Sequence, residues 1–554
     1  MNRVLFKFIS FVCFLSVAAI PMAGASSFTF YNDSTESIKA APQDWFLQDP
    51  TDDGIMGVSA QKAHDFLKDK TPKRTVVVAV IDSGVDIEHE DLQGKIWVNE
   101  KEIPGNGIDD DKNGYVDDVN GWNFIGGEDG SHVAEDSHEL TREYVRLKEK
   151  FGDLEPEDVK RRQREEYKYW QRVQENFVET REEAESNLEM HDRLHEMIET
   201  SSSLIMSAFE VDDFSFGDID GFELEDESDE MLMGALELLS RFASLVEDPE
   251  VLISELSEEL KEIKEHYEVQ VNYAYNPDFD PRSIVGDDPE NYRERHYGNN
   301  DPVGPDAAHG THVSGIIAAD RNNDLGIKGI AEHVLIMPIR AVPNGDERDK
   351  DIANAIRYAV DNGAHIINMS FGKSYSPGKK HVDRAVKYAE RKGVVLIHAA
   401  GNSSKEVNPD NNFPNRWFVR RGEASNWIEV GAASWQADEN LPARFSNYSA
   451  KAVDVFAPGV DIYSTVPGSE YKSNSGTSMA APSVSGVAAI LMAYYPDLKP
   501  KEVKSILKQS VFDQSSQEVL KPGGDNRVKF GELSVTGGLV NAYLALQLAE
   551  EMNK

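Results

Sequence analysis

The chain has 554 residues, of which 40% are hydrophobic, and a formal net charge of -41. The hydrophobic fraction is too high for a disordered chain, and the length predicts about three to four domains. The acidic surface excludes nucleic acid as an expected partner, because it repels a phosphate backbone. The single cysteine, Cys13, can form neither an internal disulfide nor a paired-cysteine zinc site.

Residues 1–25 have the pattern of a secretory signal peptide. They contain a positively charged start, an apolar run over residues 8–20 and the small-residue cleavage sequence Ala23-Gly24-Ala25. An anchoring helix is the alternative, although the run is short for a membrane span. We expect cleavage after Ala25 and a secreted or periplasmic protein with no further membrane span.

Short apolar runs alternate with helical patterns in two stretches, residues 26–130 and 302–554, which we expect to form one α/β domain. This alternation predicts a doubly wound, mainly parallel sheet with helices on both faces. Ligands of such sheets bind at the carboxyl ends of the strands, where Asp82, Ser370 and Asn402 are expected. The predicted strands cover residues 75–81, 334–339, 365–369 and 394–399, and the predicted helices include residues 352–360, 381–392 and 539–552.

The stretch between these two parts, residues 131–301, is predicted to be an acidic, mainly helical insertion. Residues 131–300 hold 47 acidic and 18 basic residues, which gives a net charge of -29. Apolar spacing predicts a long helix over residues 158–200 and two more near residues 232–246 and 251–267, preceded by a mobile acidic loop over residues 211–230. The insertion is either a lid, a partner-docking arm or a regulator, or a solvated segment without a function of its own. Its partner is unknown.

Three separate motifs supply a carboxylate, an imidazole and a hydroxyl. Val80-Ile81-Asp82-Ser83-Gly84 ends the first strand, His309-Gly310-Thr311-His312 begins a helix, and Ser475-Gly476-Thr477-Ser478 begins another helix, which continues to Pro482. A serine hydroxyl becomes a useful nucleophile when an imidazole takes its proton and a carboxylate orients that imidazole. Taken singly, Asp82 is also compatible with a turn, Ser478 with a helix N-cap, and His309 with metal binding beside His312.

Together, in the order Asp, His, Ser, these motifs resemble the subtilisin-like (subtilase) family of serine peptidases. The resemblance covers residues 44–130 and 302–548. It implies a serine endopeptidase that hydrolyses peptide bonds through an acyl-enzyme. Ser478 is then the nucleophile, His309 the general base and Asp82 the orienting carboxylate, whereas we assign His312 to structure.

Two further segments match the substrate site of that family. His398-Ala399-Ala400-Gly401-Asn402 resembles the segment whose asparagine donates to the oxyanion, together with the Ser478 N–H. The segment Ser370-Phe371-Gly372 resembles the strand that pairs with an extended protein or peptide substrate. The sequence departs from the family in the large insertion and in the absence of room for a full prodomain before Asp82. A catalytically silent scaffold that presents the insertion is the competing hypothesis.

Residues 107–118 match much of an EF-hand-like calcium loop. The expected oxygen ligands are the side chains of Asp109, Asp111 and Asn113, the Tyr115 carbonyl, and Asp117 or Asp118. Asn120 stands where such loops carry their final glutamate. The loop therefore predicts a structural calcium ion, with a plain polar turn as the alternative. A weaker oxygen-rich set comprises Asp287, Asp288, Asn300 and Asp301.

Overall fold

The computed structural model describes residues 41–222, 229–243, 246 and 248–553, so the predicted signal peptide at residues 1–25 lies outside the described residues. The described residues form two compact units. The described part of the larger covers residues 41–158 and 277–553, and that of the smaller lies within Val159–Asn276. The middle of the stretch predicted as an insertion forms the smaller unit, and its two flanks belong to the larger unit.

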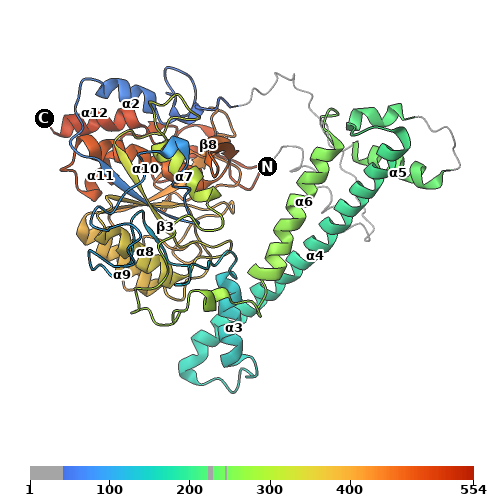
Figure 1. Cartoon of the computed structure of the whole chain (residues 1–554), viewed down its shortest axis with the longest axis horizontal. Coiled ribbons are helices and arrows are strands. Elements are labelled where there is room, and N and C mark those ends of the chain that lie inside the picture. Colours follow the sequence, from blue (N-terminus) through green and yellow to red (C-terminus); the bar gives the residue numbers. More distant parts are fainter. Residues whose placement is uncertain (1–40, 223–228, 244–245, 247, 554) are drawn as a thin grey trace. The chain divides into compact units, whose positions relative to one another are not determined.

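A nine-stranded sheet forms the centre of the larger unit (Figure 1), with the strand order β10-β13-β7-β6-β5-β4-β1-β3-β2. All neighbouring strands are parallel except β10 and β13. The predicted doubly wound, mainly parallel α/β fold is therefore confirmed. The strands are β1 (Val76–Asp82), β2 (Trp122–Asn123), β3 (Val334–Arg340), β4 (Ile366–Met369), β5 (Val395–Ala399), β6 (Trp427–Ala433), β7 (Val455–Pro458), β10 (Phe512–Asp513) and β13 (Gly538–Leu539).

Helices cover both faces of this sheet because its strands are apolar on both sides. Val78 and Val80 of β1 lie in one apolar cluster with α2, α7, α10, α11 and α12, whereas Ala79 and Ile81 lie in a second cluster with α8 and α9. Alternate residues of a strand point to opposite faces, which explains this division. The helices of the larger unit are α2 (Ala60–Leu67), α3 (Glu139–Phe151), α7 (Ala308–Ala318), α8 (Asp349–Asp361), α9 (Lys379–Lys392), α10 (Thr477–Tyr494), α11 (Pro500–Gln509) and α12 (Ala542–Met552).

Two antiparallel hairpins and several short helical turns complete the larger unit. The hairpins pair β8 (Ile462–Val466) with β9 (Glu470–Asn474) and β11 (Glu518–Leu520) with β12 (Arg527–Lys529). The 3-10 turns are η1 (Trp45–Leu47), η2 (Glu90–Leu92), η6 (Pro281–Ile284) and η7 (Phe530–Glu532). They connect the layers without adding to the central sheet.

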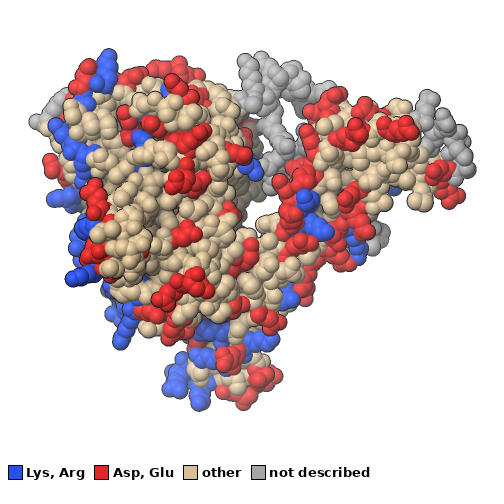
Figure 2. All heavy atoms as spheres, in the orientation of Figure 1, with Lys and Arg blue, Asp and Glu red and all other residues tan. Residues whose placement is uncertain are grey.

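The smaller unit is built from three helices, α4 (Arg164–Phe209), α5 (Glu230–Ala243) and α6 (Ile253–Val269), with short turns η3 (Arg161–Gln163), η4 (Phe216–Gly221) and η5 (Gln270–Ala274). The apolar stripe predicted on the long helix is buried along most of its length. Acidic side chains are scattered over the face of α4 and α6 that Figure 2 shows. The mobile loop predicted over residues 211–230 is wrong for the described part, since η4 and the preceding Phe214 contribute buried apolar side chains to the core. Residues 223–228 of that stretch lie outside the described residues.

Within the described part of the chain, α10 has the length and apolar composition of a membrane span, although we expected no such segment after residue 25. The helix is 89% buried in the structure. Its apolar residues form part of the cluster that packs against the central sheet. The composition of α10 is thus accounted for by its place in the core.

Candidate active site

Asp82 and His309 meet at the carboxyl end of the sheet. Asp82 is the last residue of β1, His309 is the second residue of α7, and His309 Nδ1 lies 2.6 Å from Asp82 Oδ1 although the residues are 227 positions apart. The carboxylate is buried, whereas the imidazole is 39% exposed. Burial disfavours the imidazolium, but the Asp82 carboxylate outweighs this effect and raises the pKa of His309. A neutral ring that donates from Nδ1 keeps Nε2 available as a base.

Two glycines allow this close approach. A Cβ atom at Gly310 would stand 2.0 Å from the Gly84 carbonyl oxygen and 3.1 Å from Asp82 Cβ. Gly84 has a φ of +139°, a backbone conformation that residues other than glycine rarely adopt. The glycines in both motifs are therefore required by the contact between the end of β1 and the start of α7.

Ser478 lies in the first turn of α10 and is tied to the end of β4. Its hydroxyl donates to the Ser370 carbonyl at 3.0 Å, and the Ser370 hydroxyl donates to the Ser478 carbonyl at 2.9 Å. In a regular helix the Ser478 carbonyl would accept the N–H of residue 482, but Pro482 has no N–H. The proline therefore makes this carbonyl available to Ser370 and helps to fix the position of the serine.

Asn402 and the Ser478 N–H border one small space. The Asn402 carbonyl Oδ1 accepts the N–H of Thr477 at 2.9 Å and its hydroxyl at 2.8 Å, which fixes the orientation of the amide. A Cβ atom at Gly476 would lie 3.4 Å from Asn402 Nδ2 and 3.6 Å from Ser478 N. Both nitrogen atoms therefore lie beside the space that the missing Gly476 side chain leaves open. Such a pair can stabilise an oxygen anion beside the serine.

The segment Ser370-Phe371-Gly372 leads away from β4 and is accessible at Phe371 and Gly372. It is held at its first residue by the two hydrogen bonds to Ser478. It is held at the other end by Lys373, whose N–H and C=O both pair with the backbone of Phe413 at 2.9 Å. The backbone between these anchors is therefore fixed in position next to the serine.

The imidazole of His312 binds backbone groups other than those of Asp82, His309 and Ser478. The side chain is completely buried, and its Nε2 lies 3.0 Å from the carbonyl oxygens of Ile462 and Lys472. It thereby joins α7 to the β8–β9 hairpin. Burial lowers the pKa of His312 to about 4, so the ring is neutral at physiological pH.

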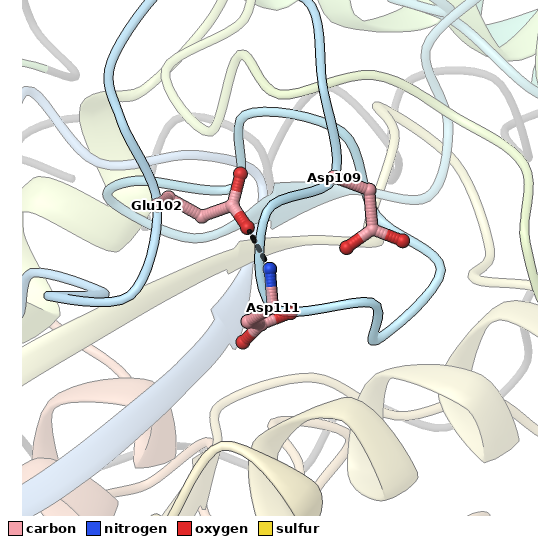
Figure 3. A group of neighbouring side chains, drawn as sticks. All are labelled: Glu102, Asp109 and Asp111. Carbon is pink, nitrogen blue, oxygen red and sulfur yellow. Dashed lines mark hydrogen bonds between the residues drawn. The ribbon is translucent and has the colours of Figure 1, made fainter.

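Three carboxylates gather in the predicted calcium loop (Figure 3). Oxygen atoms of Glu102, Asp109 and Asp111 all lie within 4.8 Å of one another. Glu102 comes from outside the loop, where no spacing rule identified it, and its oxygens accept the N–H groups of Asp111 at 3.0 Å and Asp117 at 3.2 Å. The number of close carboxylate oxygens suits a hard cation such as calcium.

The other expected ligands lie differently. The Asp117 carboxylate accepts the N–H groups of Asn106 and Gly107 at 3.2 and 2.8 Å. The Asn113 oxygen accepts the N–H of Tyr115 at 2.8 Å. In the weaker set, Asp287 forms an ion pair with Arg282 at 2.6 Å and Asp301 lies 3.2 Å from His132. Because only their carboxylate oxygens gather within 4.8 Å among the described residues, Asp109 and Asp111, with Glu102, are the candidate cation ligands.

Comparison with known proteins gives matches over both parts of the larger unit. The sequence model of the Subtilase family matches residues 73–531. A thermophilic serine proteinase from Bacillus sp. (strain AK1) is 42% identical over 222 residues, which make up 40% of this chain and 49% of that protein. Thermitase from Thermoactinomyces vulgaris is 44% identical over 184 residues, 33% of this chain and 60% of thermitase. The chain thus spans less than two thirds of the length of either relative. A solved structure of a cold adapted subtilisin-like serine proteinase matches with a TM-score of 0.33 and 29% identity, covering 42% of this chain and 72% of its own.

Proposed function

Because the chain belongs to the subtilase family, as its motifs predicted, we propose that it is a serine endopeptidase that hydrolyses peptide bonds through Asp82, His309 and Ser478. The observation that carries the proposal is the 2.6 Å contact between His309 and Asp82, which are 227 positions apart. Ser478 lies in the first turn of α10, which packs against the same sheet. A hydroxyl, an imidazole and a buried carboxylate at one strand edge are the groups that acyl transfer requires.

In this proposal the Ser478 hydroxyl exchanges its acceptor, the Ser370 carbonyl, for His309 Nε2 and then attacks the scissile carbonyl carbon. His309 takes the hydroxyl proton and passes it to the leaving amine, while Asp82 stabilises the imidazolium. Asn402 Nδ2 and the Ser478 N–H stabilise the tetrahedral oxygen anion, and the backbone of residues 370–372 pairs with the extended substrate. Water then hydrolyses the acyl-enzyme by the same proton transfers in reverse.

We propose calcium as a structural ion held by Glu102, Asp109 and Asp111. When bound, the ion would offset two of the three negative charges that otherwise repel one another at this site. Chelation of the purified protein is expected to lower its melting temperature, and calcium is expected to restore it. An Asp111→Asn variant should lose most of the calcium response. A melting curve that does not change across this titration would remove the ion from the proposal.

We further assign residues 1–25 to a secretory signal peptide and the site of action to the periplasm or the extracellular space. The catalytic domain then comprises residues 26–130 and 302–554, and residues 131–301 form an insertion between its two parts. The substrates are proteins or peptides outside the cytoplasm. Expression of the full chain, followed by fractionation and N-terminal sequencing of the mature protein, tests this assignment. An intact N-terminus on the cytoplasmic protein would contradict it.

The Ser478→Ala variant tests the activity itself. The wild-type protein is expected to cleave an unfolded protein substrate and to be labelled by a fluorophosphonate, and the variant is expected to lose both. Ser475→Ala is the matched control, since Ser475 is exposed and bonded to Asp461 rather than placed in the proposed machinery. A folded wild-type protein with neither activity would favour the silent scaffold instead.

A further inference from the structure

Lys373 directly follows the proposed substrate-binding segment, residues 370–372, and its side chain is only 1% exposed. Its ammonium donates to Glu139 Oε2 at 2.7 Å and to the Glu347 carbonyl at 2.6 Å. It also lies 3.2 Å from Asp349 Oδ1. Burial opposes the charge, but the carboxylates of Asp349 and Glu139 outweigh it and raise the pKa of Lys373. The ammonium is therefore held as a cation inside the larger unit.

The acidic partner of this cation comes from the stretch predicted as the insertion. Glu139 is the first residue of α3, in the flank of that stretch that belongs to the larger unit. It is buried, and Arg142 one turn further along α3 donates to it at 2.9 Å. Its own N–H donates to the Asp346 carboxylate at 2.8 Å. Glu139 is thus held in place by its own neighbours and, with Asp349 and the Glu347 carbonyl, surrounds the ammonium.

The backbone of Lys373 passes this constraint to the substrate-binding segment. Lys373 is bonded to Phe413 through both its N–H and its C=O, and the other end of the segment is bonded to Ser478. The two anchors are three residues apart. An extended peptide pairs with the backbone between them, so a shift of one anchor changes the direction of the hydrogen-bonding groups that the peptide meets.

We propose that Glu139 is a positioning residue for substrate binding: through Lys373, it holds residues 370–372 in the geometry that pairs with an extended peptide. The proposal rests on the peptidase activity proposed above. It assigns to the flank of the insertion a role in binding long substrates. A ligand too short to pair with residues 370–372 does not depend on this contact.

The test compares two reactions of the full chain. In Glu139→Gln, the side chain keeps its size and loses its charge. Cleavage of a chromogenic hexapeptide is expected to lose about 10-fold in kcat/KM, mainly through a higher KM. Labelling of Ser478 by a small fluorophosphonate is expected to stay within about 2-fold of the wild-type rate. Lys373→Met should show the same selective loss, and the double variant should be no worse than either single variant.

Asp351→Asn provides a matched control. Asp351 is a buried residue of α8, and it forms an ion pair at 2.7 Å with Arg282 in the other flank of the insertion. This ion pair does not involve residues 370–373. This variant is expected to lose stability while keeping the wild-type ratio of peptide cleavage to labelling. If the ratio of peptide cleavage to labelling is the same in Glu139→Gln as in Asp351→Asn, the proposal is overturned. If Glu139→Gln does not fold, Glu139→Asp replaces it, since this variant keeps the charge on a shorter side chain. A wild-type KM for the hexapeptide in both Glu139→Asp and Lys373→Met would also overturn the proposal. Wild-type protein that neither cleaves nor labels would instead contradict the peptidase activity.

Discussion

The two units of the chain use charged side chains in different ways. In the larger unit, several ion pairs are buried: Arg416 and Asp454 are 5% and 0% exposed, as are Arg282 and Asp351. In the smaller unit, most ion pairs of the described residues lie on the exposed faces of single helices, such as Arg193 with Glu189 on α4, which are 69% and 66% exposed. One pair, between Lys264 of α6 and Asp192 of α4, joins two helices, and its side chains are 28% and 52% exposed. Buried ion pairs thus add to the apolar clusters that hold the larger unit together, whereas the smaller unit combines an apolar core with more exposed ion pairs.

The difference has a physical cause. Removing a charge from water is costly, so a buried ion pair is retained only with good geometry and further hydrogen bonds. Asp454 meets this condition, since Arg416, Lys504 and Lys508 all approach it. An exposed pair on a helix remains solvated and contributes little. Substitutions of similar chemistry are therefore expected to have very different consequences in the two units.

The largest effect is expected for Asp454→Asn in the larger unit. The substitution leaves the buried Arg416 guanidinium without its carboxylate, and breaking a buried pair in this way costs about 3–5 kcal/mol. Urea unfolding, followed by the fluorescence of the tryptophans, measures the loss. The double variant Arg416→Met/Asp454→Asn removes both charges and should recover part of the lost stability. If Asp454→Asn lowers the free energy of unfolding by less than about 1 kcal/mol, the buried ion pair contributes no more than an exposed one.

The regular part of the larger unit could be predicted because its signals are local. The strands β1, β3, β4 and β5 lie in short apolar runs, and the Asp82 and His309 motifs carry glycines that their contact requires. In the smaller unit the apolar stripe of α4 was likewise visible in the sequence and is confirmed. Where burial depends only on the apolar pattern of one segment, the sequence is sufficient.

Features that depend on a partner from elsewhere in the chain were missed. The strand β6 contains Glu429, which is buried because His398 and the Trp427 indole bind it at 3.0 and 2.7 Å. Glu102 joins the calcium loop from outside its motif. Glu139 was included in the acidic, mainly helical insertion, although Lys373, more than two hundred residues away, makes it a core residue of the larger unit. A local pattern cannot show that a charged side chain will find such a partner.

The pH dependence of stability measures the effect of burial on one carboxyl group of the larger unit, that of Glu347. Burial raises the pKa of Glu347 to about 8, although Lys373 acts in the opposite direction. The folded state then binds a proton that the unfolded state releases, so this group's contribution to stability falls as the pH rises from about 4.5 to 8. Glu347→Gln removes the ionisation. The difference in melting temperature, Glu347→Gln minus wild type, is expected to be larger at pH 9 than at pH 6 by roughly 2 °C or more.

The control for this measurement is Glu551→Gln, which neutralises an exposed carboxylate of α12. It should follow the wild type at both pH values. Parallel melting curves for Glu347→Gln and the wild type would mean that the buried carboxyl does not titrate between pH 6 and pH 9, and the contrast between the two units would then rest on ion pairs alone.

The smallest effect is expected for Glu189→Gln on α4. The change removes the exposed pair with Arg193, which lies one turn further along the helix, and should cost no more than about 0.5 kcal/mol. Ile198→Ala, on the buried stripe of the same helix, should cost about 2–5 kcal/mol because it leaves a cavity in the core of the smaller unit. Hydrogen exchange of the α4 backbone in the full chain compares the two variants directly. If Glu189→Gln speeds exchange as much as Ile198→Ala does, surface charge rather than the apolar core stabilises the smaller unit.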